Sequence, residues 1–206
     1  DRQSERVKAR VTCHAPVDLA GELLHLADGW RNGSGSTEAL SAVLESSAGN
    51  LSRRLPADAD VVLSSCVLSQ IFLASVEVLG SGHPQLGPLC RALIQLHLRA
   101  ATLSARPGGH VVFALDVTSN RLTPEIASSL GLTGVLDRAL EQGRYFLGSH
   151  PKQIEALFRE DAVLRREAEA PRPLDPWLWT VSEQDVFLVF GMVWRRTDPS
   201  ADEQQG

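Results

Sequence analysis

The sequence is poor in cysteine, in aromatic residues and in long apolar runs. Its 206 residues contain only three cysteines, Cys13, Cys66 and Cys90, at wide spacing. Because no pair has the spacing of zinc ligands and the number is odd, the cysteines predict neither a zinc site nor a disulfide framework. Cys66 and Cys90 lie in apolar surroundings and are expected to be small buried residues. This cysteine usage favours a reducing compartment, and we expect a cytoplasmic protein.

Positive charge is also scarce. The formal net charge is −5 and the pI is about 5.7, so the chain carries no strong signal for nucleic-acid binding. No apolar stretch approaches the roughly 18 residues of a membrane span, and no signal-peptide pattern is present, so we expect no membrane contact. The 43% hydrophobic and 22% charged residues are typical of a globular domain. Nothing in the composition indicates an oligomeric state.

Strands and helices are expected to alternate along the chain, which predicts a single α/β domain over residues 1–196. A polar and disordered tail is expected over residues 197–206. Alternating and apolar runs predict strands over residues 6–13, 61–63, 110–116 and 185–196. Apolar residues at helical spacing predict helices over residues 19–26, 37–51, 67–79, 89–103 and 151–164. Within the helix over residues 89–103, we expect His97 and Arg99 to lie off the apolar face.

The rest of the chain is organised around the strand over residues 61–63 and the helix that follows it. Three small residues, Ser64, Ser65 and Cys66, join the two elements. Open α/β sheets bind ligands outside the carboxyl ends of their strands, so small residues at this point favour a ligand crevice. The alternative is that Ser64 and Ser65 only cap the helix.

A second polar group follows the strand over residues 110–116. Asp116 and Thr118 stand at its carboxyl end, and Tyr145, Phe146 and His150 form a small aromatic group further along the chain. Trp177 and Trp179 are two residues apart, and on a strand both side chains would share one face. These aromatic residues fit either a binding surface or ordinary core packing.

Three segments in order resemble those of Rossmann-like S-adenosylmethionine-dependent methyltransferases. Residues 60–70 resemble the family's fourth-strand motif, and Pro107-Gly108-Gly109 resembles the turn before its fifth strand. Residues 186–194, followed by Arg195 and Arg196, resemble its antiparallel last strand. The resemblance implies an α/β fold with a Rossmann-like, mostly parallel sheet, helices on both faces and an antiparallel last strand.

The resemblance implies a methyltransferase, or the C-terminal part of one, that uses S-adenosylmethionine as its cofactor. The methyl acceptor would be a small molecule or a group of unknown class. Asp18 and Leu19 would lie beside the adenine, although Asp18 equally suits a helix cap. Ser64, Ser65 and Cys66 would approach the methionine end of the cofactor. The acceptor pocket would be shaped by Asp116, Thr118, Tyr145 and Trp179.

One feature of the family is missing from the sequence. The glycine-rich loop after the family's first strand, and the acidic residue that ends its second strand, have no counterpart here. The resemblance therefore starts near the third strand and predicts a fold that is incomplete at its N-terminal side. In the family's sheet the two missing strands lie between the third and the fourth. A chain without them must close that gap or expose strand edges.

This departure supports a second hypothesis. The chain would be a catalytically inactive, methyltransferase-like scaffold that acts as an interaction or structural module. Trp177, Trp179 and Trp194 would then contact a partner, because tryptophan is enriched in binding hot spots. A hydrolase is disfavoured because the sequence has no G-x-S-x-G motif around a nucleophilic serine.

Overall fold

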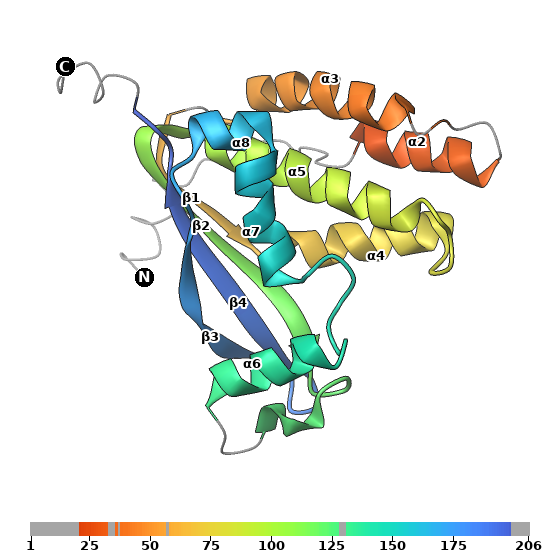
Figure 1. The fold of residues 1–206 in the computed structure, drawn as a ribbon, viewed down its shortest axis with the longest axis vertical. Helices are drawn as coiled ribbons and strands as arrows, with labels where there is room; N and C mark the ends of the chain where they lie inside the picture. Colours follow the sequence, from red (N-terminus) through yellow and green to blue (C-terminus); the bar gives the residue numbers. More distant parts are fainter. Residues whose placement is uncertain (1–20, 33–35, 37, 57, 128–130, 199–206) are drawn as a thin grey trace, which may run out of the picture.

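The computed structural model describes residues 21–32, 36, 38–56, 58–127 and 131–198. The predicted strand over residues 6–13, the predicted adenine contacts Asp18 and Leu19, and most of the predicted tail lie outside these residues. The described residues form a four-stranded sheet with helices (Figure 1). In chain order the elements are α2 (Gly21–Arg31), α3 (Glu38–Arg54), β1 (Ala59–Ser65), α4 (Val67–Leu79), α5 (Leu86–Ser104), β2 (Ala105–Ser119), the 3₁₀ helix η1 (Pro124–Ala127), α6 (Leu132–Glu141), α7 (Pro151–Glu160), α8 (Ala162–Glu167), β3 (Arg172–Thr180) and β4 (Val186–Arg195).

The sheet is mixed, with the strand order β1-β2-β4-β3. β1 and β2 are parallel because α4 and α5 connect them as a crossover. β3 and β4 are antiparallel because a short turn joins them, with the Val181 N–H donating to the Asp185 carbonyl at 2.9 Å. β4 also runs antiparallel to β2. The α/β class is as predicted. β1, β2 and β3 run in the same direction and β4, the last strand, runs against them, so three of the four described strands share a direction.

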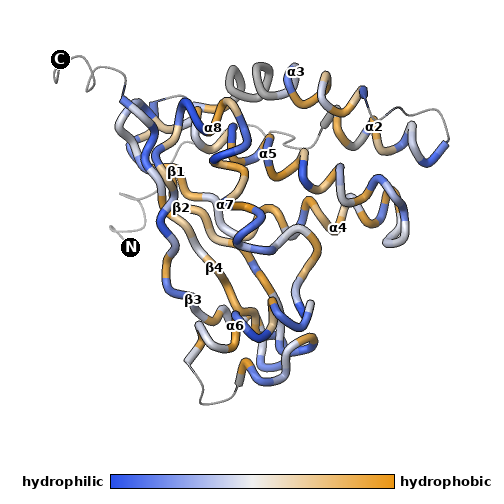
Figure 2. Tube along the Cα trace, in the orientation of Figure 1, coloured by the Kyte–Doolittle hydropathy of each residue, from blue (hydrophilic) through white to orange (hydrophobic). Residues whose placement is uncertain are grey.

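The main core lies between α5 and one face of the sheet. Val111 and Phe113 of β2 are buried on this face, and Trp194 of β4 lies opposite Val111 in the register. The Trp194 ring contacts Phe113 and also Phe158 of α7, and its Nε1 donates to the Thr102 hydroxyl of α5 at 3.0 Å. Figure 2 shows the apolar stretches that β2, β4 and α5 contribute. α2 and α3 contact α4 and α5 and form a further helical layer (Figure 1).

The opposite face of the sheet is less covered at β1. Val61 and Leu63 point to this face and are 59% and 69% exposed. Within the described part of the chain, β1 pairs with β2 alone, so its outer edge has no strand partner there.

The Pro-Gly-Gly segment lies inside β2 instead of before it. The register passes from Ala59 opposite Ala105 to Val61 opposite His110, so the intervening residues of β2 bulge out of the pairing. Gly108 has a φ of +75°, and a Cβ on Gly109 would lie 2.9 Å from the Ala59 carbonyl oxygen. Glycine is therefore required at both positions, because residue 108 adopts the left-handed conformation and residue 109 lies close to the backbone of Ala59.

Two helix predictions need correction. His97 and Arg99 do not lie off the buried face of α5, because they are 5% and 4% exposed. Strands and helices contact α5 on several sides, so little of its surface faces solvent. The predicted helix over residues 151–164 is divided at Asp161, whose carboxylate accepts hydrogen bonds from Val163 and Leu164 and caps α8.

Candidate functional site

β1 ends at a sharp turn beside β2, which continues to Ser119 and not only to Asp116 as the sequence predicted. Ser65 pairs with Ala114 in the parallel register, and the Cys66 N–H donates to the Ala114 carbonyl at 2.9 Å. Cys66 has a φ of 53°, in the left-handed region that non-glycine residues rarely adopt. This conformation turns the chain directly from β1 into α4, so the first turn of α4 lies beside Asp116 of β2.

A hydrogen-bonded group links the turn after β1 to Asp116 of β2. The Ser69 hydroxyl, in the first turn of α4, lies 2.9 Å from the Asp116 Oδ2 and 2.9 Å from the Cys66 carbonyl oxygen. Asp116 is 9% exposed, and its Oδ1 has no hydrogen-bond partner within the described residues. A carboxylate oxygen that is buried without a partner is costly, so this atom marks a place where a ligand group fits.

The Cys66 thiol is next to the same carboxylate. Burial, together with the neighbouring Asp116, raises the pKa of the Cys66 thiol to about 12. The thiol therefore stays protonated at neutral pH. Because the thiolate is the nucleophilic form of cysteine, the environment of Cys66 disfavours nucleophilic chemistry at this residue.

A cavity of about 350 Å³ opens beside Asp116. One wall comes from α4, and the other comes from the loop before α7 and the start of β4. The loop is attached to β2 because the Phe146 N–H donates to the Val117 carbonyl at 2.8 Å. The rings of Phe146 and Phe187 lie 6.3 Å apart between centroids. The lining residues are Ser69, Gln70, Phe72, Leu73, Val76, Asp116, Phe146, Leu147 and Phe187.

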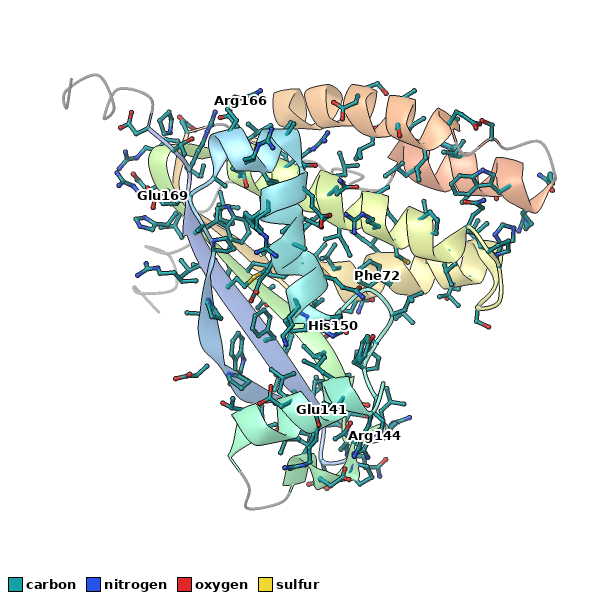
Figure 3. All side chains as sticks on the ribbon, in the orientation of Figure 1. Phe72, Glu141, Arg144, His150, Arg166 and Glu169 are labelled. Carbon is teal, nitrogen blue, oxygen red and sulfur yellow. The ribbon has the colours of Figure 1, made fainter. Side chains whose placement is uncertain are left out.

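The contact between Phe72 and Gly148 sets the shape of the cavity. Gly148 has a φ of +76°, and a Cβ there would lie 2.6 Å from the Phe72 Cζ. In Figure 3, Phe72 of α4 and His150 at the start of α7 lie on neighbouring segments in the middle of the molecule. The loop can approach α4 this closely only because residue 148 has no side chain.

Of the four predicted acceptor-pocket residues, the structure places Asp116 in the cavity wall and the other three outside it. Tyr145 precedes two lining residues but does not line the wall. Its ring contacts the His150 ring, with 5.2 Å between the ring centroids. Thr118 is fully buried, and its hydroxyl is bonded to that of Thr123 at 3.0 Å. Trp179 lies on β3, 44% exposed and opposite Phe187 in the register, outside the cavity wall.

The predicted cofactor contacts also separate. Ser65 is exposed at the carboxyl end of β1, and Cys66 is buried in the turn. Ser64 faces the core, where its hydroxyl lies 2.6 Å from the Nε2 of His97. As a consequence of the strand's alternation, Ser65 and Ser64 point to opposite faces of the sheet.

Sequence reasoning missed the α4 wall of the cavity. Ser69, Phe72, Leu73 and Val76 recur at helical spacing on one side of α4. This pattern was present in the sequence, but helical spacing of apolar residues is also the usual sign of core packing. Only the turn at Cys66 directs this side of α4 toward Asp116.

A second cavity of about 320 Å³ lies beside Ser64 and His97, between the edge of β1 and α5. Burial lowers the pKa of His97 to about 4, so the imidazole is neutral at physiological pH. The pair resembles a serine with its general base. However, the Nδ1 of His97 has no partner in the described part of the chain, whereas a catalytic imidazole is usually oriented by a third group. We therefore interpret the pair as buried polar packing.

Comparison of the chain with models of protein families, with curated proteins and with solved structures finds no match. Within the described residues there is no group of three or more His, Cys, Asp or Glu side chains that could hold a metal ion. None of the helices from α2 to α8 is both long and apolar enough to cross a membrane.

Proposed function

We propose that the chain is an S-adenosylmethionine-dependent methyltransferase, or the C-terminal part of one. The observation that supports this most is the cavity between α4, which follows β1, and Asp116 in the carboxyl half of β2. Open α/β sheets bind their ligands at the edge where the carboxyl ends of their strands lie. The antiparallel β4 beside β2 is also what the sequence resemblance implies for the last strand.

The residues at this edge fit part of the cofactor's expected surroundings. Ser65 is exposed at the carboxyl end of β1, and Cys66 forms the turn into α4, the helix that lines one wall of the cavity. Ser64 does not fit a cofactor contact, because its hydroxyl is already bonded to His97. When bound, the cofactor would supply an electrophilic methyl group. The chain's own contribution would be to position the acceptor in the cavity and to exclude water, since proximity supplies much of the rate of such a transfer.

The first test is calorimetric titration of S-adenosylhomocysteine into the full chain. We expect saturable binding at one site. Ser65→Trp should weaken it by at least about tenfold, because the indole would cover the carboxyl end of β1, whereas Ser65→Ala should change it by less than about threefold. Asp60→Asn, at the other end of β1, is the distal control. Absence of binding at millimolar ligand, or equal affinities for Ser65→Trp and Ser65→Ala, would contradict a cofactor site at this edge.

The alternative is a catalytically inactive scaffold that acts as an interaction module. It is favoured by exposed apolar residues on and beside β3, where Trp177, Trp179 and Val181 are 37%, 44% and 62% exposed. Tryptophans at a surface are typical of partner contacts. The expectation that Trp194 also contacts a partner is wrong, because its side chain is buried in the main core. If S-adenosylhomocysteine does not bind, and Trp179→Ala abolishes recovery of a partner identified by cross-linking, the scaffold is the better description.

A further inference from the structure

We propose that the cavity beside Asp116 binds a small organic ammonium ion, with its positive nitrogen at the Asp116 carboxylate and its apolar body between α4 and the loop before α7. This names a substrate class for the acceptor pocket and rests on the proposed function only in that sense. The binding site itself follows from the cavity and its charge.

The carboxylate lacks a positive partner. Asp116 is 9% exposed and its Oδ1 accepts no hydrogen bond within the described residues. Among the described residues that form the wall of the cavity there is no Lys, Arg or His. A buried charge is normally paired, so a positive ligand would complete this site.

The groups that already contact Asp116 leave its charge in place. Ser69 donates one hydrogen bond to Oδ2, and the N-terminal turn of α4 has a partial positive charge that stabilises an anion. The Cys66 thiol lies beside the carboxylate, but a thiol is a weak donor and is uncharged at neutral pH. The site therefore presents one unsatisfied, negatively charged acceptor to the cavity.

The remaining wall selects the body of the ligand. Apart from Ser69, Gln70 and Asp116, the lining side chains are apolar, and three of them are phenylalanines. Aromatic faces attract organic cations in addition to excluding water. The volume of about 350 Å³ is at the lower end of small-molecule sites. These properties suit a compact amine with an aromatic or aliphatic body.

A series of ligands that differ in charge tests this inference without any substitution in the chain. Calorimetry with the full chain at neutral pH would compare the 2-phenylethylammonium ion, 2-phenylethanol and 3-phenylpropanoate, which differ chiefly in charge. We expect the ammonium ion to bind at least about tenfold more tightly than the alcohol, and the carboxylate not to bind detectably. Equal affinities for the ammonium ion and the alcohol would overturn the inference, as would tighter binding of the carboxylate.

Variants locate the site. Asp116→Asn keeps the shape and removes the charge, so the preference for the ammonium ion should fall below about threefold. Glu77→Gln removes one negative charge from the exposed side of α4 and should leave the preference unchanged. Leu73 lines the cavity and is 59% exposed, so Leu73→Arg can be made without disturbing the core. It should weaken ammonium binding at least about fivefold relative to Leu73→Gln.

If Asp116→Asn fails to fold, the comparison of Leu73→Arg with Leu73→Gln still tests the inference. An unchanged preference in Asp116→Asn, or equal affinities in Leu73→Arg and Leu73→Gln, would overturn the inference. Its failure is distinguishable from that of the methyltransferase proposal. Ammonium binding without S-adenosylhomocysteine binding would support the ammonium site and contradict the methyltransferase proposal. S-adenosylhomocysteine binding without ammonium binding would support a methyltransferase with another class of acceptor.

Discussion

At the scale of single residues, His97 links stability to pH. Burial lowers its pKa to about 4 in the folded chain, whereas an unfolded histidine has a pKa near 6.5. Between these values the unfolded chain binds a proton that the folded chain excludes. The stabilising contribution is therefore complete above about pH 6.5 and is lost as the pH falls toward 4, by up to about 1.4 kcal/mol per pH unit.

Urea unfolding between about pH 4.5 and 7 measures this contribution. We expect His97→Gln to flatten the pH dependence of the free energy of unfolding in this range. The exposed His110 is the matched control, so His110→Gln should retain the slope of the unsubstituted chain. Parallel profiles for His97→Gln and the unsubstituted chain would show that His97 is not the group responsible.

Asp161 has two structural tasks at once. It accepts from Arg99 Nε at 2.9 Å, where both side chains are almost fully buried, and it caps α8. Asp161→Ala would leave the guanidinium with only the exposed Glu45 as a partner, so we expect a loss of about 3–5 kcal/mol in the free energy of unfolding.

The control for Asp161 is the exposed ion pair between Arg91 and Glu160. Glu160→Ala should change the free energy of unfolding by less than about 1 kcal/mol, because exposed pairs contribute little. Thermal and urea unfolding of both variants give the comparison. A similar small loss for both would mean that the buried pair is not the stabilising element that its geometry indicates.

At the scale of elements, the loop before α7 depends on Gly148. Gly148→Ala would place a methyl group against the Phe72 ring in a left-handed backbone conformation. We expect it to lower the free energy of unfolding by about 1–3 kcal/mol and to weaken any ligand in the cavity. Gly143→Ala has a similar φ of +67° and open space around it, so it measures the backbone term alone, about 1 kcal/mol.

A double-mutant cycle separates the two causes. If the Phe72 ring is the obstacle, Phe72→Leu should recover part of the loss in the Gly148→Ala background, so the two effects should not add. Additive losses would mean that the backbone conformation, and not the contact with Phe72, is what requires glycine at this position.

Elements differ in how well the sequence predicts them. The bounds of α4 agree with the expected helix, because the apolar run is continuous and Gly80 ends it. The helix over residues 151–164 was expected to be continuous, but Asp161 divides it. An aspartate within a helical pattern does not by itself identify a cap. Asp161 also pairs with Arg99, which is distant in the sequence, and the helical pattern does not show this contact. His97 and Arg99 were misplaced for the same reason, since their partners Ser64 and Asp161 are far away in the sequence.

At the scale of the whole molecule, the α/β class followed from the sequence. Asp116 lines a cavity, and its role as part of an acceptor pocket stays a prediction. The pairing of β4 with both β2 and β3 was not specified, because strand order depends on contacts between distant segments. Thr118 and Trp179 were grouped with Asp116 by their positions after or near strands, but burial and strand direction place them elsewhere.

The position of β4 predicts how the fold responds to truncation. β4 lies between β2 and β3 and contributes Trp194 to the main core. A chain that ends after Val181 should therefore lack dispersed amide signals in NMR spectra, and a peptide of residues 182–198 added in trans should restore them. Dispersed signals from the truncated chain alone would contradict the central role that the sheet order gives to β4.

The same strand order has a consequence for synthesis on the ribosome. β2 and β3 are both synthesised before β4, but they are not adjacent in the finished sheet, because β4 lies between them. At about 5–20 residues per second, β2 must wait several seconds after leaving the ribosome for the strand that covers its second edge. During that interval one edge of β2 has no strand partner and its apolar residues are exposed. We therefore expect chaperones that bind extended apolar segments to bind β2.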